Sequence, residues 1–529
     1  MSYKVSFFLL IFLYFSCSEG YDNSSLTIFK YNESAGINTL DPIFAKDQAT
    51  IWATSQIFNG LVQLDSNLNV QPCIAQDWSI SNSGLSYTFN LRNDVFFHSD
   101  NVFENKTRKV IASDFTYSFD RLLNPAEAAP GAWVLSNVKE YYAINDSLFI
   151  IELRNPFPAF LALLSMQYCS VVPKEVVESK NFHINPIGTG PFCFQYWEDG
   201  IKLVFRKNTN YFERKDSFLL PYLDAISITF IKDKQSAFLQ FIQGNLDFLS
   251  GIDGSYKDEV LTKEGLLRNK YKNKLKLYSQ PYLNTEYFGF LMDDSTSILE
   301  EKRIRQAINY GFDRNKMIKY LRNGIGEAAS FGFIPDGMPG FSKAVKGYVY
   351  DTIKAKELLR DAGHPNGTGI GEIVLYTTSS YLDLCEYIQN QLSELGLNII
   401  IEVNPPSTHR QMVATSKLSF FRGSWIADYA DGENYLALFY SRNFCPMGPN
   451  YTHFKNHEFD LLYEESLSES NDTLRFHLYN KMDQIIINEA PIVPLYYDRV
   501  VRFTQNNIIG LENNAMNMLN LKTVKKNHN

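Results

Sequence analysis

The sequence has no excess of basic residues. Lys and Arg number 50 against 58 Asp and Glu, which gives a formal net charge of −8 at pH 7, so the basic surface typical of nucleic-acid-binding proteins is missing. Charged residues make up 20% and apolar residues 45% of the 529 positions, and this composition excludes a disordered chain. Because typical domains have roughly 100–150 residues, we expect two to four lobes.

Long hydrophobic runs are also rare, and the only one lies at the N-terminus. Lys4 precedes an apolar run from Val5 to Ser16, which is too short to span a bilayer because a spanning helix needs about 20 residues. Residues 1–16 are therefore predicted to be a signal peptide. Cys17 follows as in a bacterial lipoprotein signal, although Tyr14 stands where Leu is commonest; ordinary cleavage nearby is the alternative. We expect an exported protein that is lipid-anchored through Cys17 on the periplasmic or cell-surface side of the membrane.

Motifs for metal, redox or phosphate chemistry are absent. The six cysteines form no CxxC pair, and no P-loop, HExxH or GxSxG motif occurs. Residues 367–371 are rich in glycine, but they follow a predicted helix and precede a predicted strand, the reverse of a phosphate-binding loop. Cys169 and Cys193 are the closest candidates for a disulfide, and buried free thiols are the alternative.

Two pairs of polar residues have spacings that invite a functional interpretation. His453 and His457 are four apart and could ligate a metal, but no acidic third ligand is evident, so packed or solvated histidines are favoured. Asp428 and Asp431 could act as an acid–base pair. They are three residues apart on one predicted loop, which places them poorly to flank a bond from opposite sides. No catalytic residue is predicted.

The hydrophobic pattern alternates between strands and helices. Residues 79–91 have the alternation and the Ser-Asn-Ser-Gly turn of a hairpin, and a helix is predicted from Ser113 to about Asn124. Farther along, a strand at 372–377, a helix at 382–395 and a strand at 397–403 form a βαβ unit, which requires a parallel sheet. The fold class is therefore α/β.

Several motifs in order along the chain resemble bacterial extracellular solute-binding protein family 5, the oligopeptide- and dipeptide-binding lipoproteins of ABC importers. They include an Asn59-Gly60-Leu61 segment, the stretch Ala75–Arg92, the Pro186–Phe192 segment that matches PxGTGP(Y/F), and Pro335–Gly340. The resemblance implies a two-lobed periplasmic-binding-protein-like fold of type II, with ligand between the lobes. It divides the chain into a lobe 1 core (17–47, 181–278 and 493–529), an extra domain inserted in lobe 1 (48–180) and lobe 2 (279–492).

The resemblance also implies which residues hold the ligand. Peptide-binding members bind their ligand as an extended strand, and the segment Arg422–Tyr429 matches their WxADY region. Asp428 would bind the α-amine of a peptide, Gly423, Ser424 and Trp425 would pair with its main chain, and Tyr429 would border it. On the opposite lobe, Ala35, Gly36 and Ile37 would pair along the other edge of the ligand.

Arg422 has two possible roles. It stands where oligopeptide receptors place an arginine for the ligand carboxylate, but it could instead form an interdomain ion pair. The segment Ser380–Asp383 lacks the basic residue often found there, and Val413 replaces another basic position, so the preferred peptide length is left open.

These features predict a monomeric receptor, without cofactor or enzymatic activity, that binds oligopeptides and delivers them to an ABC transporter permease. The alternatives are a receptor for a nickel chelate, haem or sugar on the same fold and, less favoured, a hydrolase. The 77 aromatic residues are consistent either with a ring-lined site or with codon bias. Trp425 and Tyr429, and more weakly Tyr282 and Tyr287, are the rings expected near the ligand.

Overall fold

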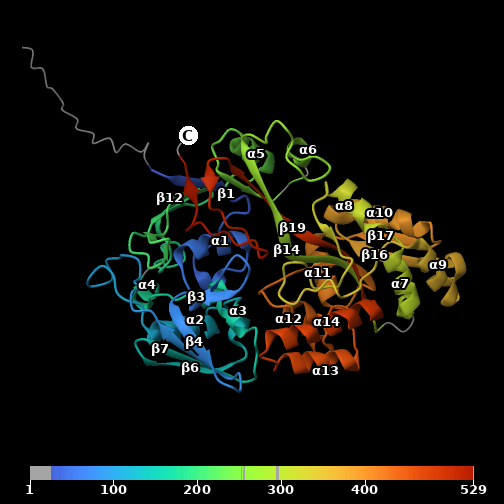
Figure 1. Ribbon diagram of the computed structural model, residues 1–529, viewed down its shortest axis with the longest axis horizontal. Helices are drawn as coiled ribbons and strands as arrows, with labels where there is room; N and C mark the ends of the chain where they lie inside the picture. The colour runs from blue at the N-terminus through green and yellow to red at the C-terminus, as the bar shows by residue number, and fades with distance from the viewer. Residues whose placement is uncertain (1–25, 180, 252, 254–255, 294–296, 528–529) are drawn as a thin grey trace, which may run out of the picture.

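Two long strands, β14 (Leu275–Phe290) and β19 (Ile492–Gln505), connect the two halves of the molecule (Figure 1). The computed structural model describes residues 26–179, 181–251, 253, 256–293 and 297–527. The predicted signal peptide and Cys17 lie outside these residues. One mixed sheet of eleven strands extends through both halves in the order β17-β16-β18-β14-β19-β13-β1-β12-β9-β8, with β15 (Glu327–Ala328) paired to β19.

The half that contains the first residues described forms lobe 1. Its part of the sheet contains β1 (Ile28–Asn32), β8 (Phe192–Glu198), β9 (Lys202–Lys207), β12 (Ala225–Thr229) and β13 (Phe248–Ser250). Its helices are α1 (Gln48–Ile57), α5 (Lys234–Ile242) and α6 (Lys257–Val260). Three two-stranded ribbons complete this half: β2 (Val62–Leu64) with β3 (Val70–Pro72), β10 (Arg214–Lys215) with β11 (Phe218–Leu219), and β20 (Ile508–Ile509) with β21 (Lys525–Lys526).

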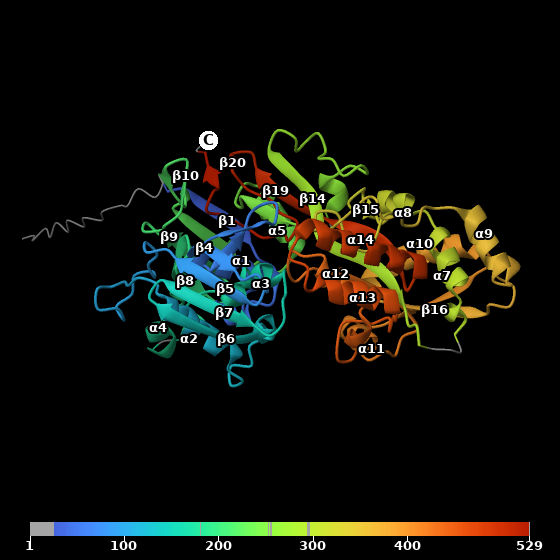
Figure 2. The same ribbon diagram turned by 60° about the horizontal axis from the view of Figure 1, so that its bottom comes forward.

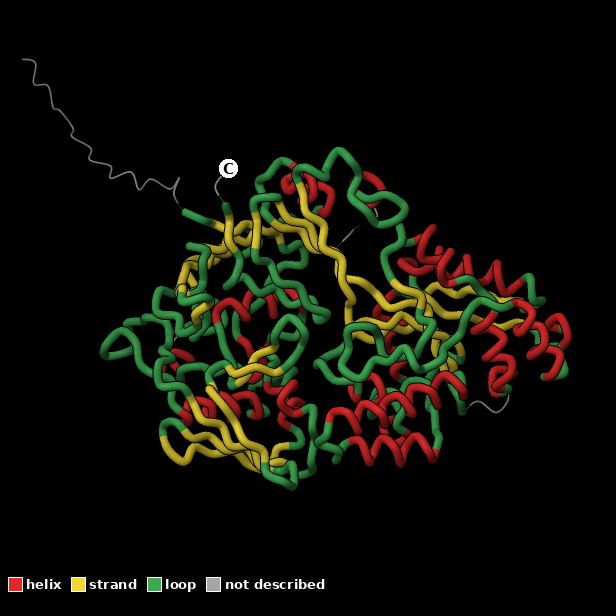
Figure 3. Tube along the Cα trace, in the orientation of Figure 1, coloured by secondary structure: helices red, strands yellow, loops and turns green. Residues whose placement is uncertain are grey.

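A separate four-stranded antiparallel sheet lies below lobe 1 in Figures 1 and 3. Its order is β4-β5-β7-β6, from β4 (Ala75–Ile80), β5 (Ser86–Leu91), β6 (Val138–Asn145) and β7 (Leu148–Leu153), with α2 (Ala112–Leu123), α3 (Phe160–Leu164) and α4 (Lys174–Ser179) beside it. Its buried side chains, such as Phe89 and Phe149, belong to the same apolar cluster as Phe29 and Ile226 of lobe 1. The predicted extra domain therefore shares a core with the lobe that carries it.

Lobe 2 is the helix-rich half at the right of Figures 1 and 2. Its strands are β16 (Glu372–Thr377), β17 (Asn398–Val403) and β18 (Phe420–Ile426). Its helices are α7 (Lys302–Tyr310), α8 (Arg314–Leu321), α9 (Thr352–Asp361), α10 (Leu382–Ser393), α11 (Pro406–Ala414), α12 (Glu433–Leu436), α13 (His457–Ser466) and α14 (Asp472–Glu489). The buried side chains of lobe 2 form two main clusters, one of which also includes Leu68 of the extra domain, while Tyr429 of lobe 2 belongs to the cluster of lobe 1.

The predicted local elements are confirmed. The hairpin is β4–β5 with Gly84 in its turn at φ = 68°, and β16, α10 and β17 form the βαβ unit with parallel strands. Helix α2 begins at Ala112, one residue before the predicted start, because the Asp114 carboxylate accepts a hydrogen bond from the Ile111 amide and satisfies the first turn.

The pairing of β14 with β19 is irregular where the two strands pass from one lobe to the other. Pro281 pairs with Arg499 and Thr285 pairs with Tyr497, so three residues of β14 oppose one residue of β19. The two-lobed α/β architecture is confirmed, and the ends of the lobes given above remain predictions. Among the described residues, no helix has the length and apolarity that a membrane span requires.

Candidate ligand-binding cleft

Strand β18 has one edge that is mostly unpaired. Strand β14 pairs with it from Phe420 to Ile426, whereas β16 meets it only through Tyr376 opposite Phe421. In the part of the chain that the structure describes, no strand pairs with residues 422–426 on that second edge. The predicted residues Gly423, Ser424 and Trp425 lie on this segment and are partly exposed. An exposed strand edge is a template for a further extended chain.

Two side chains already contact main-chain oxygens of this segment. The ring nitrogen Nε2 of His409 lies 2.8 Å from the Arg422 carbonyl oxygen, and the Tyr435 hydroxyl donates to the Trp425 carbonyl oxygen at 3.2 Å. Both contacts come from elements that flank β18, so they fix the strand where it leaves the sheet.

Arg422 forms an ion pair with Glu286. Glu286 lies on β14, next to β18 in the same sheet, and it also accepts hydrogen bonds from Asn284 (3.2 Å) and Tyr381 (3.3 Å). The pair therefore joins neighbouring strands within one lobe and is not the interdomain pair that the sequence left open. Burial raises the pKa of Glu286, and the Arg422 charge opposes this rise.

Trp425 and Asp428 are held by one side chain, that of Asn434. The Asn434 Oδ1 atom accepts a hydrogen bond from the Trp425 indole at 2.9 Å and from the Asp428 amide at 3.2 Å. This arrangement fixes the turn after β18 and leaves the Asp428 carboxylate exposed in a recess. Partial burial there raises the pKa of Asp428, and the contact with Asn434 opposes the rise.

Tyr429 is the predicted site residue that touches the opposite half of the molecule. Its ring is 7% exposed and lies 6.4 Å, centre to centre, from both Trp133 and Phe157 of the extra domain. Its hydroxyl donates to Glu433, which also accepts from Tyr463. Tyr429 therefore joins lobe 2 to the extra domain through aromatic packing.

A cavity of about 440 Å³ lies between lobe 1, the extra domain and the Asp428 end of β18. This volume falls in the ~300–1,000 Å³ range of ligand pockets. Its lining includes Trp52 of α1, Tyr168 after α3, Tyr282 at the hinge and Asp428. The Asp428 charge contributes to raising the pKa of Tyr168 to about 12, after burial as the main cause, so these two groups lie within electrostatic reach of each other.

The structure places only one residue of the predicted set in the cavity. Asp428 belongs to its lining, together with its neighbours Ile426 and Ala427, whereas residues 422–425, Tyr429 and residues 35–37 are outside it. Ala35 and Gly36 form a turn after β1, in which Gly36 has φ = 77°, and Ile37 is buried in the lobe 1 core. Of the two weaker aromatic candidates, Tyr282 lines the cavity, while Tyr287 is buried against Phe333 with ring centres 5.2 Å apart.

Asp428 and Asp431 have different environments. Asp431 is 4% exposed and accepts hydrogen bonds from Tyr479 (2.7 Å) and Arg475 (3.3 Å), so it anchors α14 in the core of lobe 2. It is not part of the cavity lining. The two carboxylates therefore do not share a site as an acid–base pair would.

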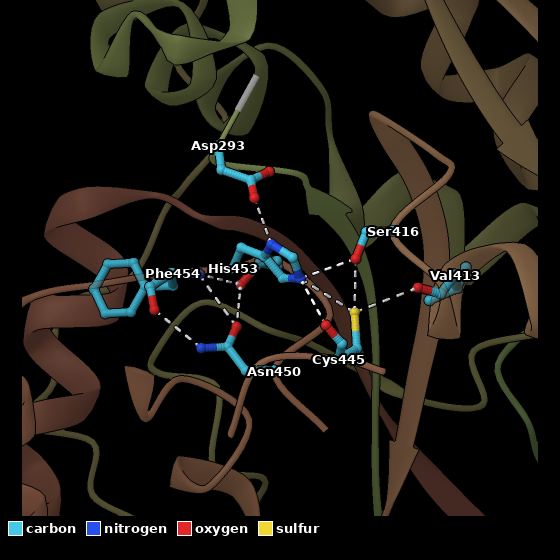
Figure 4. A network of polar contacts seen from close by, with 8 residues as sticks. Asp293, Val413, Ser416, Cys445, Asn450, His453 and Phe454 are labelled. Atoms are coloured by element: carbon cyan, nitrogen blue, oxygen red, sulfur yellow. Dashed lines mark hydrogen bonds and ion pairs between the residues drawn. The ribbon is translucent and has the colours of Figure 1, made fainter. Parts of the chain in front are cut away.

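His453 belongs to a polar network without His457 (Figure 4). Its Nδ1 atom lies 2.6 Å from Asp293 Oδ2, and its Nε2 atom lies 2.9 Å from Ser416 Oγ and 3.4 Å from Cys445 Sγ. Both ring nitrogens are thus occupied by protein groups. No cluster of three or more residues able to hold a metal ion is found among the described positions.

The five described cysteines are all free thiols, so Cys169 and Cys193 are not bridged. Burial raises the pKa of both thiols to about 12, which keeps them protonated and unreactive at neutral pH.

Sequence reasoning missed the residues of lobe 1 that line the cavity, such as Lys46, Trp52 and Tyr168. Their only signal is that α1 directly precedes the Asn59-Gly60-Leu61 segment that resembles the family. Lys46 directly precedes the N-cap residue Asp47 of that helix.

The profile of "Bacterial extracellular solute-binding proteins, family 5 Middle" matches residues 69–444. The chain belongs to this family. It is 26% identical to Heme-binding protein A of Haemophilus influenzae over 84% of this chain and 82% of that protein, and 24% identical to the glutathione-binding protein GsiB of Escherichia coli over 90% of each. It also superposes on the periplasmic binding protein DppA of Helicobacter pylori, solved with the peptide STSA, with a TM-score of 0.73, 25% identity and coverage of 94% and 98%. Family 5 proteins are extracellular solute receptors, so the prediction of a binding protein outside the cytoplasm is confirmed at this level.

Proposed function

We propose that this protein binds peptides, oligopeptides above all, in the cleft between its lobes and delivers them to the permease of an ABC transporter. The observation that carries the proposal is the unpaired edge of β18, which ends at the exposed carboxylate of Asp428 beside the cavity. Backbone pairing along such an edge provides affinity without reading side chains. A carboxylate at its end neutralises an ammonium group that would be costly to bury alone.

The relatives support this proposal to different degrees. DppA of Helicobacter pylori was solved with a peptide, and GsiB is a glutathione-binding protein. In this proposal Asp428 binds the amine of the peptide. Gly423, Ser424 and Trp425 pair with its main chain, and Ala35, Gly36 and Ile37 lie along its opposite edge. Arg422 is less suited to a ligand carboxylate because Glu286 already neutralises it.

The test uses a synthetic library of random tri- to hexapeptides made with free or acetylated N-termini. Calorimetry is expected to detect binding of the free library and at least tenfold weaker binding of the acetylated library. Asp428→Asn should remove most of this difference, and Asp199→Asn, on an exposed loop of lobe 1, is the matched control. Equal binding of the two libraries by the native protein would remove Asp428 from this role.

Haem is the second candidate ligand, since Heme-binding protein A is among the relatives and the cavity is lined by apolar and aromatic side chains. They include Met166, Met516 and Met518 together with Trp52 and Tyr282. Protein purified from its native host without added ligand distinguishes the candidates. Bound haem gives a Soret absorption band, whereas bound peptides give a ladder of masses in native mass spectrometry. A nickel chelate or a sugar would give a single discrete mass.

We further propose that the protein is monomeric and is anchored to the membrane by a lipid on Cys17. Metabolic labelling with palmitate should mark the native protein and leave Cys17→Ser unlabelled. Release of the unlabelled variant from the membrane fraction would agree with this anchor, and labelling of Cys17→Ser would contradict it. Light scattering of the protein without its first 17 residues would report the mass of one chain.

A further inference from the structure

The cavity contains five charged side chains, and three of them are already satisfied by the protein. Lys522 pairs with Glu213, which neutralises its charge, and it also donates to Gln63 at 2.8 Å. Glu512 pairs with Lys215 at 3.1 Å. Asp65 accepts hydrogen bonds from the amides of Asn67 and Asn69 and from the Asn69 and Gln71 side chains, at 2.8–3.2 Å.

The other two charges are Asp428 and Lys46, which come from opposite lobes. Lys46 is exposed, and among the described residues its ammonium group makes no ion pair or side-chain hydrogen bond. It directly precedes α1, whose first residue Gln48 lines the same cavity. The N-terminal end of a helix favours negative charge. Asp47 offsets part of this effect, since its carboxylate caps Thr50 at 3.0 Å.

The cavity meets β18 only at the Asp428 end. Ile426, Ala427 and Asp428 belong to its lining, and Gly423, Ser424 and Trp425 do not. A peptide that extends along the edge of β18 with its amine on Asp428 would therefore place its first residue, and not its later residues, at the mouth of this cavity. This step rests on the function proposed above.

We propose that the cavity receives the first residue of the ligand and that Lys46 selects a carboxylate there. The preferred ligands are peptides with an acidic group close to the N-terminal amine. That group is the side chain of an N-terminal Glu or Asp, or the free α-carboxylate of a γ-linked glutamyl residue. The ammonium group of such a ligand faces Asp428 of lobe 2, and its carboxylate faces Lys46 of lobe 1. The ligand therefore bridges the lobes and favours their closed arrangement.

The test compares tetrapeptides that differ only in the first residue, with Glu or Gln followed by three alanines, and a third peptide with γ-linked Glu. Since the carboxylate gains a charge-assisted hydrogen bond from Lys46, the native protein is expected to bind a Glu-first peptide roughly 10- to 100-fold more tightly than the Gln-first peptide. The α- and γ-linked peptides show which source of the carboxylate fits. A peptide with Glu at position 3 controls for general attraction of negative charge.

Lys46→Met should reduce the preference for Glu over Gln to less than about twofold, and its thermal unfolding should match that of the native protein, which shows that the variant is folded. Lys232→Met removes the same charge from an exposed position of lobe 1 and should behave as the native protein. No preference in the native protein, or a preference that survives Lys46→Met, overturns the role of Lys46 while peptide binding stands. If none of these peptides nor the random library binds, the proposed function fails and this inference fails with it.

Discussion

The Arg422 guanidinium lies 3.5 Å from the centre of the Tyr381 ring while it forms an ion pair with Glu286 on the next strand. The three side chains come from β18, the segment before α10, and β14. They therefore fix the position of β18 relative to the β16 side of the sheet, just where its second edge becomes free.

This relationship predicts a large cost for removing one partner of the pair. Glu286→Gln should lower the free energy of unfolding by about 3–5 kcal/mol, because it leaves the Arg422 charge largely buried without a counter-charge. Chemical denaturation measures the effect. The double variant Glu286→Gln with Arg422→Met should recover much of the loss, since no unpaired charge remains. Losses that simply add in the double variant would show that the two residues do not interact.

A second prediction concerns the contact of Tyr429 with Trp133 and Phe157. Tyr429→Ala removes two aromatic pairs of about 0.5–1.5 kcal/mol each and should shift the unliganded protein toward open forms by roughly tenfold or more. Small-angle scattering should report a larger radius of gyration. Tyr429→Phe keeps the ring and loses only the hydrogen bond to Glu433, so it should scatter like the native protein. An unchanged radius in Tyr429→Ala would mean that the contact does not hold the lobes together.

The affinity for peptides should depend on pH through Asp428. Only the carboxylate anion attracts an ammonium group, and burial raises the pKa of Asp428 above its ordinary value. Affinity should therefore be full near neutral pH and decline as the pH falls through this raised pKa. Calorimetry between pH 7.5 and 4.5 measures the decline, which should be absent in Asp428→Asn. A native profile that matches that of the variant would contradict the prediction.

Asp483 gives a different prediction, for stability. It is fully buried, and its carboxylate accepts hydrogen bonds only from the Phe333 (2.6 Å) and Ile334 (3.3 Å) amides among the residues described. Desolvation raises its pKa from 3.8 to about 7 despite these bonds. Since the folded protein then holds a proton that the unfolded chain releases, stability should fall as pH rises between these two values and level off above about 7.

The measurement is the difference in unfolding free energy between the native protein and Asp483→Asn across this pH range. The variant lacks the titrating group, so the native protein should lose stability relative to it as pH rises. A constant difference would show that Asp483 does not carry a raised pKa. Asp361→Asn, on the exposed end of α9, serves as a control for general effects of a removed charge.

The local elements could be predicted because their causes are local. The alternation of Tyr87 and Phe89 with polar residues specifies β5, and the apolar stripe of Leu384 and Ile388 specifies α10, whatever the rest of the chain does. The turn after β18 was also predictable as a site, since its residues are contiguous. By contrast, the partner of Arg422 is Glu286, 136 positions away, and no pattern in either segment indicates the other.

The same limit applies to the cavity. Lys46, Tyr168 and Asp428 come from three distant parts of the chain and line one cavity only once the chain has folded. Likewise, the sequence could predict a position near the ligand only for aromatic residues that lie within a contiguous motif. Tyr282 lines the cavity, whereas Tyr287, five residues along the same strand, is core.

The interrupted pairing between Pro281 and Thr285 has a consequence for recognition of the protein by other molecules. On either side of this interruption β14 and β19 pair with each other, and a second, smaller register shift follows between Glu286 and Tyr287. A change in the angle between the lobes would therefore concentrate in this short stretch of the two strands. A ribbon of two strands bends most easily where its pairing is interrupted. Ligands that differ in sequence would then bring the surfaces of the two lobes into the same relative orientation. A partner protein could thus sense that the cleft is occupied from the outer shape alone, without contacting what occupies it.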